Sequence, residues 1–285
     1  MVATPLGNAE DITARAIRVL READLIACED TRRLARLRGA HNIRTPAISY
    51  FEHNESRRVP ELVARLRRGE SIALVSDAGT PAISDPGFGL VRAAIDAGIT
   101  VVPVPGPSAV VAALSVAGLP TDHFVFEGFL PSKAGERRRE LERLSRESRT
   151  IVFYESARRL TELLAAMIEA IGAARQVVVM REMTKTFEEV VRGSLSEVLR
   201  HFRENSPLGE VTIVMAGADK TEGSASAPET IDAQAAMALL REAGLSLKDA
   251  SAVLSRLSGV PRREIYRAAV KAHSSAEGHK RDRDD

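Results

Sequence analysis

The chain has 285 residues, 28% of them charged, and a formal net charge of +1 at pH 7. This length allows two modest domains with a sizeable core, and the small net charge argues against a strongly basic, histone-like protein. It does not exclude a nucleic-acid substrate, because basic side chains can gather in patches. The single cysteine, Cys28, excludes an internal disulfide and is typical of a reducing compartment, so we expect a cytoplasmic protein. We expect no metal site, because the six histidines lack ligand spacing, and no membrane helix, because no apolar run approaches about 20 residues.

Residues 1–118 alternate between strand and helix patterns. Short apolar runs predict strands at residues 25–28, 47–50, 72–75 and 100–104. Apolar residues at helical spacing predict helices at residues 11–22 and 56–68. Because such alternation requires crossover connections, we expect an N-terminal α/β domain with a mainly parallel sheet.

A second α/β domain is expected over residues 119–217, after the joint Leu119-Pro120-Thr121-Asp122. Its strands are predicted at residues 124–128, 151–154, 176–180, 188–192 and 211–215. Its helices are predicted at residues 135–146, 157–171 and 194–202. Neighbouring strand patterns occur here together with crossovers, so we expect a mixed sheet.

The C-terminal part of the chain has a different character. Residues 218–229 are rich in Gly, Ser, Ala and charge, which is typical of a flexible linker. A helical module is expected at residues 230–273, with helices at 231–243, 246–258 and 261–273. Three such helices fit a helix-turn-helix or a small packing module equally well. The charged tail, residues 274–285, is expected to be disordered.

Three loops rich in small residues suggest a ligand site. The most informative covers residues 76–87, with two prolines and two aspartates after an apolar strand; the others cover residues 3–8 and 104–109. Small residues bring bare backbone close to a ligand. The loops have neither the lysine of a P-loop nor a dinucleotide fingerprint, so an uncharged or cationic ligand is favoured over a polyphosphate. Loops at the carboxyl ends of strands converge at one sheet edge, which predicts a cleft for a nucleotide-like or sulfonium cofactor.

In this order, the loops resemble the tetrapyrrole-methylase superfamily of S-adenosylmethionine-dependent methyltransferases. Within it, the sequence is similar to the 16S ribosomal RNA cytidine 2′-O-methyltransferase family. Four stretches carry the narrower likeness: Ala3-Thr4-Pro5-Leu6-Gly7-Asn8, Cys28-Glu29-Asp30-Thr31-Arg32, residues 76–87, and Gly128-Phe129-Leu130-Pro131-Ser132-Lys133. Residues 153–158 and 181–189 support it. The resemblance covers the chain to about residue 217, and the helical segment also fits.

One departure concerns the first strand. Only Met1 and Val2 precede the first loop, whereas the family has several apolar residues there. Either a neighbouring segment compensates for this short strand, or the natural start lies upstream.

The resemblance implies S-adenosylmethionine as cofactor and one cytidine ribose in the decoding region of 16S rRNA, within the small ribosomal subunit, as the methyl acceptor. It also implies a homodimer. The cofactor residues carried over are Leu6, Ala78, Gly79, Thr80, Ile83, Ser108, Ala109, Tyr154 and Met183. Thr80 and Ser108 are the expected side-chain contacts, while structural turns would also account for Gly79.

A ribose hydroxyl reacts readily only when its proton leaves, so a positioned base is expected to assist. The candidates are Lys185, Asp30, Glu182 and Glu155. Lys185 could instead orient the hydroxyl, bind a phosphate or lie solvated on the surface. The pair Glu29-Asp30 directly follows an apolar strand, and Asp30 could simply cap the next helix.

Basic groups beside the loops are the expected phosphate contacts. The RNA-contact candidates are Arg32, Arg33, His53, Asn54, Arg58, Lys133 and Arg137. Aromatic residues Tyr50, Phe51 and Phe129 could stack on a splayed base, although core packing is the competing role for Phe129.

Two other functions remain open at this stage. A small-molecule methyltransferase acting on a tetrapyrrole fits the superfamily, but such enzymes carry different first and second loops. A noncatalytic RNA-binding protein is the other alternative, and the intact loops argue against it.

Overall fold

The computed structural model describes residues 1–218, 233–242, 244–258, 261–263, 265–267 and 269. The chain forms two compact units, Met1–Ala218 and Asp219–Asp285, which are described separately. The expected linker beyond residue 218, the expected tail at 274–285 and part of the third C-terminal helix lie outside the described residues.

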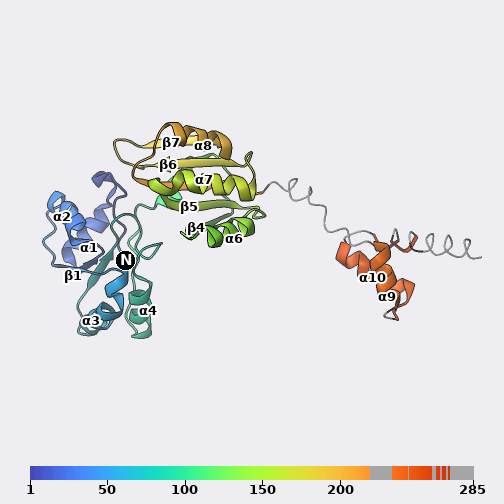
Figure 1. Ribbon diagram of the computed structural model, residues 1–285. Coiled ribbons are helices and arrows are strands. Elements are labelled where there is room, and N and C mark those ends of the chain that lie inside the picture. The colour runs from blue at the N-terminus through green and yellow to red at the C-terminus, as the bar shows by residue number, and fades with distance from the viewer. Residues whose placement is uncertain (219–232, 243, 259–260, 264, 268, 270–285) are drawn as a thin grey trace, which may run out of the picture. The chain divides into compact units, whose positions relative to one another are not determined.

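The first sheet of the larger unit is parallel, as predicted. It contains β1 (Leu25–Cys28), β2 (Ala47–Ser49) and β3 (Ile72–Val75) in the order β2-β1-β3. Helices α1 (Ala14–Glu22) and α2 (Thr31–Ala40) pack on one face, against Ile26 and Cys28. Helices α3 (Glu55–Arg67) and α4 (Phe88–Asp96) pack on the other, against Leu25 and Ala27. The alternation of β1 side chains thus supplies both halves of the core. In Figure 1, α1 and α2 lie on one side of this sheet, and α3 and α4 lie on the other.

One prediction for this domain was wrong, and a second differs at the start of its helix. The strand expected at residues 100–104 does not form in the described chain; only Val104 makes an isolated parallel bridge, with Val2. Met1 and Ala3 also bond to Val102 and Val104 through their backbones, but these bonds do not form a strand ladder in the described chain. The helix expected at 11–22 is interrupted after the 3-10 turn η1 (Ala9–Asp11), because Thr13 caps α1 by accepting a hydrogen bond from the amide of Ala16. A second 3-10 turn, η2 (Glu52–Asn54), precedes α3.

The second sheet is mixed, which confirms the prediction. Its strands are β4 (Phe124–Phe129), β5 (Thr150–Ser156), β6 (Gln176–Arg181), β7 (Glu189–Ser194) and β8 (Glu210–Met215). The order is β4-β5-β8-β6-β7, and only the β4–β5 pair is parallel. Helices α6 (Ala134–Leu144), α7 (Ala157–Ile171) and α8 (Leu195–Glu204) supply the core on one face.

Helix α5 (Ala109–Ala117) covers the opposite face of this second sheet, where Val110 and Leu114 pack with Val152 and Val214. It begins directly after the third small-residue loop. A loop that follows the first sheet in sequence is therefore anchored on the second sheet, and this places the three loops between the two sheets.

In the smaller unit, α9 (Ala233–Glu242) and α10 (Leu247–Ser258) pack together through Met237, Ala250 and Leu254. Ser246 accepts a hydrogen bond from the amide of Asp249 at 3.1 Å, so it caps α10 as predicted. The described residues between 262 and 269 are helical.

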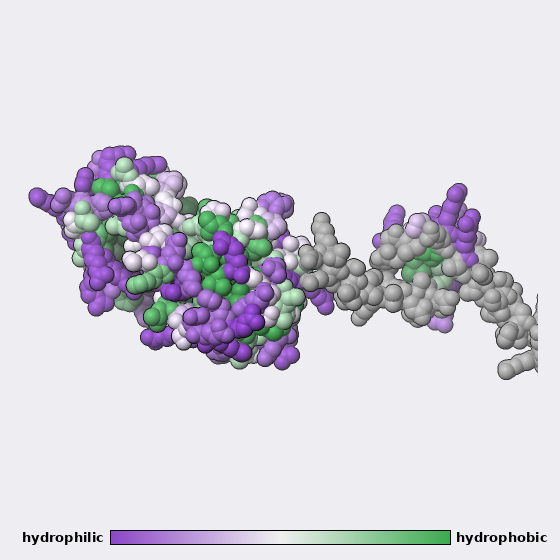
Figure 2. Space-filling model, turned by 90° about the horizontal axis from the view of Figure 1, so that it is seen from above, coloured by the Kyte–Doolittle hydropathy of each residue, from purple (hydrophilic) through white to green (hydrophobic). Residues whose placement is uncertain are grey.

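Hydrophilic side chains cover most of the visible surface of the larger unit in Figure 2, and hydrophobic residues gather near the middle of that face. None of the helices in the described ranges combines the length and the apolar character that a membrane span requires.

Candidate active site

The three small-residue loops come together, as the sequence predicts. Thr4 and Gly79 exchange backbone hydrogen bonds of 2.9 and 3.0 Å, which join the first loop to the second. The hydroxyl of Thr80 donates to the carbonyl of Pro107 at 3.1 Å, which joins the second loop to the third. Since this hydroxyl already has a protein partner, Thr80 contributes to the shape of the site as well as to any ligand contact.

Glycine is required in these loops by their mutual packing. Gly79 has a φ of +81°, and a Cβ there would lie 3.3 Å from the Leu6 side chain. A Cβ on Gly106 would lie 2.9 Å from the Cβ of Ala3, closer than side chains approach. Small residues therefore serve the contact between loops in addition to leaving backbone accessible.

A cavity of about 350 Å³ lies where the loops meet β5 and β8. Eight of the nine residues expected to bind cofactor line it: Leu6, Ala78, Gly79, Thr80, Ile83, Ser108, Ala109 and Tyr154. Met183 does not line it and packs instead against the core on the α5 side of the sheet. The Phe129 ring lies 5.7 Å from the ring of Tyr154, so these two residues form an aromatic part of the cavity wall.

The lining of this cavity is rich in acidic side chains. Five carboxylates line it, Glu29, Asp77, Asp85, Glu155 and Glu210, together with one basic residue, Arg33. In a cleft with low-dielectric walls, such a set attracts a cation and repels a polyanion. The cavity therefore fits a cationic, partly apolar ligand.

Asp85 is the carboxylate best suited to accept a proton, and the reasoning from sequence did not select it. Burial, followed by the charge of Glu29, raises its pKa to about 6. Burial, followed by the charge of Asp85, raises the pKa of the Tyr154 phenol to about 12. Asp85 therefore titrates near neutral pH beside the aromatic wall, whereas Tyr154 stays protonated. The available signal was the second aspartate of the 76–87 loop, which precedes Pro86.

Backbone strain is concentrated near this site. Within the described ranges, five non-glycine residues have a φ between +51° and +70°, and four of them lie in two segments next to the cavity. Ala82 and Ser84 belong to the second loop, and Glu182 and Thr184 to the segment after β6. Each such conformation costs about 1–3 kcal/mol and is common where a site is held in a fixed shape.

Lys185 and Glu182 form an ion pair beside the cavity. The Lys185 ammonium lies 2.9 Å from Glu182 Oε1 and 3.4 Å from Glu210 Oε2. Burial lowers the pKa of Lys185, but the hydrogen bond to Glu182 and the charge of Glu210 outweigh it and raise that pKa overall. The same hydrogen bond lowers the pKa of Glu182. Lys185 thus stays protonated and suits a hydrogen-bond donor rather than a base.

The aliphatic part of Lys185 lies against Gly7 of the first loop. A Cβ at Gly7 would come within 2.3 Å of Lys185 Cγ, and the amide of Asn8 donates to the Thr184 hydroxyl at 3.0 Å. The first loop and the segment after β6 therefore pack against each other and stabilise each other's position.

The other two base candidates are occupied by structural contacts. Asp30 caps α2 by accepting from the amide of Arg32 at 2.8 Å, and its bond with the Arg32 side chain lowers its pKa to about 2. Glu155 is 3% exposed, accepts from the amide of Ser156 at 2.8 Å and lies 3.2 Å from Arg159. Both side chains therefore have structural roles, although Glu155 Oε2 is buried without a hydrogen-bond partner.

The candidates for RNA contact separate into two groups. Arg32, Arg33, His53 and Lys133 are exposed, and Arg33 lines the cavity while pairing with Asp77 at 3.1 Å. A neighbouring hollow of about 620 Å³ shares Arg33 with the cavity and is also lined by Arg36 and Lys185. Basic groups therefore lie at the edge of the acidic cavity.

Three expectations need correction. Arg137 is 4% exposed and binds the Ser132 carbonyl and Glu162, so its guanidinium does not reach solvent. Asn54 is buried, with its amide bonded to Ser49 and Phe51. Arg58 is partly exposed and pairs with Glu61 at 2.7 Å, so its contact with RNA stays a prediction. Tyr50 is 1% exposed, with its hydroxyl on Glu55, so it has no face to stack on a base.

Comparison with known proteins agrees with this architecture. Residues 1–199 match the family Tetrapyrrole (Corrin/Porphyrin) Methylases, and residues 227–273 match the RsmI C-terminal HTH domain. A solved structure of cobalt precorrin-4 methyltransferase, CbiF, has a TM-score of 0.57 at 20% identity, covering 75% of this chain and 92% of that chain. A uroporphyrin-III C-methyltransferase from Thermus thermophilus, complexed with S-adenyl homocysteine, has a TM-score of 0.53 at 20% identity, covering 75% and 94%. At such identity these structures show the fold alone.

Sequence relatives are much closer. Proteins named ribosomal RNA small subunit methyltransferase I include one from Mesorhizobium japonicum, 44% identical over 98% of this chain and 93% of the relative. One from Pseudomonas aeruginosa is 47% identical, with coverage of 95% and 96%. Both the predicted fold class and the family resemblance are confirmed. The chain therefore belongs to the tetrapyrrole methylase family, within the group of relatives named ribosomal RNA small subunit methyltransferase I.

Proposed function

We propose that this methyltransferase uses S-adenosylmethionine to methylate ribosomal RNA of the small subunit, at the ribose 2′-hydroxyl of one cytidine in the decoding region of 16S rRNA. The names of the relatives support ribosomal RNA of the small subunit as the substrate. The acidic cavity formed by the three loops is the observation that carries the cofactor assignment. The cytidine and the 2′-oxygen come from the sequence resemblance.

The cavity residues fit this cofactor. S-adenosylmethionine carries a sulfonium, an ammonium and a carboxylate, hence a net positive charge that suits the five lining carboxylates. Adenine needs an apolar slot with backbone hydrogen bonds, which Leu6, Ile83 and the Ala78–Thr80 backbone would supply. When bound, the cofactor supplies an electrophilic methyl group on positively charged sulfur.

The protein would act mainly by alignment and by receiving one proton. Well-oriented reactants gain on the order of 7–11 kcal/mol, and loops that already contact one another supply such order. The Asp85 carboxylate would hold the proton that leaves the attacking hydroxyl, a contribution of roughly 10²–10⁴-fold. Lys185, protonated and paired with Glu182, would donate to a ribose or phosphate oxygen near the cavity mouth.

The RNA would approach over the basic edge of the cavity. Arg33 and Arg36 line the adjoining hollow, and Arg32 is exposed on the same helix. These guanidinium groups can bind phosphates while the cavity itself repels them. A homodimer, implied by the resemblance, would enlarge this basic surface, and sedimentation of the purified protein tests that state.

The alternative of a tetrapyrrole substrate is disfavoured by the same electrostatics. Tetrapyrrole precursors carry several carboxylates, which the acidic lining would repel. A visible chromophore that copurifies with the protein would restore this alternative.

The decisive test is methyl transfer from labelled S-adenosylmethionine to small ribosomal subunits that lack their native methylations. The RNA is then digested, and its nucleosides are identified by mass spectrometry. A single new 2′-O-methylcytidine is expected. If calorimetry shows cofactor binding but no nucleoside gains a methyl group, the RNA substrate is refuted and the cofactor assignment stands. If the cofactor does not bind, both assignments are refuted.

A further inference from the structure

Strand β4 contains an extra residue just before it reaches the cavity formed by the three loops. Phe126 pairs with Val152 of β5, and the next paired residue of β4 is Gly128, opposite Phe153. Glu127 therefore has no backbone partner in this register, which is the pattern of a β-bulge. Because side chains alternate along a strand, the extra residue reverses the face on which every later side chain of β4 lies.

The bulge places three aromatic rings on one face of the second sheet. In the shifted register Phe129 pairs with Tyr154. The Tyr154 ring lies 4.9 Å from the ring of Phe126 and 5.7 Å from that of Phe129. Without the extra residue, Phe129 would pair with Glu155 instead and lie on the opposite face, together with Phe153. The bulge therefore turns Phe129 into the cavity wall, and bulges next to active sites commonly redirect a side chain in this way.

The backbone that follows Phe129 is anchored by helix α7. Arg159 of this helix donates to the carbonyl of Leu130 at 3.2 Å and to that of Pro131 at 3.5 Å. Its guanidinium also lies 3.2 Å from the buried carboxylate of Glu155. Because these contacts fix the chain directly after Phe129, the ring is presented from a rigid support.

Phe129 lies beside the proposed proton acceptor. Gly128 has a φ of +62°, and a Cβ there would lie 3.0 Å from Ser84 Oγ, so the second small-residue loop packs directly on the backbone next to Phe129. Asp85 follows Ser84 and lines the same cavity. After burial, the charge of Asp85 is the next cause of the raised pKa of Tyr154, whose ring neighbours that of Phe129. A nucleotide held at Phe129 would therefore have its ribose in the part of the cavity that contains Asp85.

The Phe129 ring is open to a ligand. The residue lines the cavity and is nevertheless 57% exposed, so the ring lies at the cavity mouth and core packing does not account for its position. The adenine slot proposed above is formed by Leu6, Ile83 and the Ala78–Thr80 backbone, which belong to the first and second loops. The aromatic surface on β4 is thus left for the second reactant.

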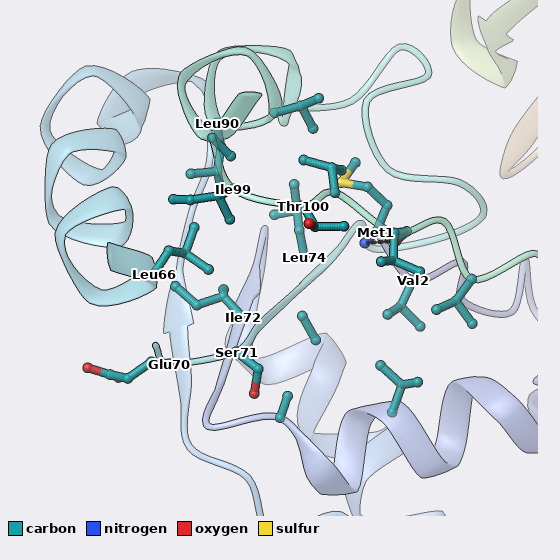
Figure 3. Close-up of a pocket in the computed structure, with 18 of the residues that line it drawn as sticks. Met1, Val2, Leu66, Glu70, Ser71, Ile72, Leu74, Leu90, Ile99 and Thr100 are labelled. Atoms are coloured by element: carbon teal, nitrogen blue, oxygen red, sulfur yellow. Dashed lines mark hydrogen bonds between the residues drawn. The ribbon is translucent and has the colours of Figure 1, made fainter. Parts of the chain in front are cut away.

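A larger cavity beside β3 offers no such surface. It has a volume of about 540 Å³, and its apolar residues Leu66, Ile72, Leu74, Leu90 and Ile99 gather around it in Figure 3. None of the described residues that line it is aromatic. Because a base that leaves its stack is held by stacking on a flat side chain, an acceptor base fits the loop cavity rather than this larger one.

We propose that Phe129 is the stacking platform for the base of the nucleotide that receives the methyl group, an inference that rests on the proposed function. The base leaves its stack in the RNA and covers the exposed face of the ring, which holds the attached ribose at the cavity. Every base has a flat π surface, so Phe129 positions the nucleotide and does not select cytosine. Stacking of a base on an aromatic side chain changes affinity roughly 5- to 150-fold.

The first test compares variants by methyl transfer to small ribosomal subunits that lack their native methylations. Phe129→Leu keeps an apolar side chain but removes the flat ring, so kcat/KM should fall roughly 5- to 150-fold. Its Tm should stay within about 2 °C, because the side chain is exposed. Phe129→Trp should retain kcat/KM within about threefold, since a larger ring still stacks.

Phe124→Leu is the matched control. Phe124 lies on the same strand, is 42% exposed and is not among the residues that line the cavity. This variant should leave kcat/KM unchanged, so a loss confined to Phe129→Leu identifies the ring at the cavity and not aromatic surface on β4 in general.

A second measurement uses a fluorescent residue at the same position. The chain contains no tryptophan, so Phe129→Trp introduces a single one. Prepared with 5-hydroxytryptophan, this variant can be excited selectively in the presence of the tryptophans of ribosomal proteins. Its emission should be quenched by the small subunits and unchanged by S-adenosylhomocysteine alone, because the base and not the cofactor stacks on the ring. Phe124→Trp, prepared in the same way, should show no change with the subunits.

The outcomes separate this inference from the proposed function. If the parent is active and Phe129→Leu stays within about threefold of it, the stacking role is wrong while the proposed function stands. Quenching of Phe129→Trp by S-adenosylhomocysteine alone would assign the ring to the cofactor site instead. Loss of activity in Phe129→Leu without quenching of Phe129→Trp by the subunits would show a structural role. If the parent methylates no RNA nucleoside, the proposed function and this inference both fail.

Discussion

Replacement of Asp85 by Asn should lower activity and raise stability together. The amide keeps the size of the carboxyl group but accepts no proton at neutral pH, so kcat/KM for methyl transfer should fall roughly 10²–10⁴-fold. In the parent, with a pKa of about 6 for Asp85, kcat/KM should fall about tenfold per pH unit below pH 6. Asp85→Asn should remove this acid limb.

The stability effect follows from the same pKa. The pKa of an aspartate in the unfolded chain is about 3.9, whereas that of Asp85 in the folded protein is about 6. The protonated carboxyl therefore stabilises the fold below pH 4, and this contribution is lost as the pH rises through 6. A difference of about two pKa units corresponds to about 2–3 kcal/mol. Asp85 is only partly buried, so solvent screening reduces this effect. At pH 7.5, Asp85→Asn should raise the free energy of unfolding by about 1 kcal/mol and Tm by a few degrees.

The assay combines labelled methyl transfer at pH 5–8.5 with urea unfolding at pH 4 and 7.5. Asp96→Asn is the matched control, because Asp96 is exposed on α4, where it forms a surface ion pair with Arg92. This control should change neither the methyl-transfer activity nor the free energy of unfolding appreciably. Activity of Asp85→Asn within about threefold of the parent would refute the proton-acceptor role. Loss of both activity and stability would show instead that Asp85 is a structural residue.

Three further changes probe the rest of the site. Lys185→Met should reduce kcat at least about tenfold while leaving Tm within about 2 °C, because the stem remains on Gly7 and only the charged donor is lost; equal kcat by the same transfer assay would remove Lys185 from the mechanism. Arg33→Ala should weaken binding of the small subunit and reduce the slope of log K against log salt by about one, measured by filter binding at several salt concentrations. Cofactor affinity measured by calorimetry should not fall, because the cavity then loses its one basic residue. Arg137→Ala should cost about 1–3 kcal/mol in urea unfolding and leave RNA affinity unchanged, since this guanidinium is buried on Ser132 and Glu162; weaker RNA binding by the folded variant would reinstate Arg137 as a contact.

The local pattern of the chain was sufficient for much of the fold. The apolar runs at β1 and β3 and the helical spacing of α7 predicted the bounds that the structure shows. These elements are readable because burial on one or both faces imposes a period of 2 or 3.6 along the chain itself. The convergence of the three loops also followed from topology, because the carboxyl ends of parallel strands share one edge.

Properties that depend on the neighbours of a residue in space required the tertiary structure. The sequence shows that Arg137 and Arg33 are both basic and beside loops, but only packing buries the first and leaves the second at the cavity. Asp85 is one aspartate among many until burial and the charge of Glu29 raise its pKa. Residues 100–104 have the composition of a strand, yet a strand needs a partner, and in the part of the chain that the structure describes Val104 makes an isolated bridge with Val2 instead of a ladder. Burial, charge coupling and strand pairing are relations between distant segments, so they are decided when the chain folds.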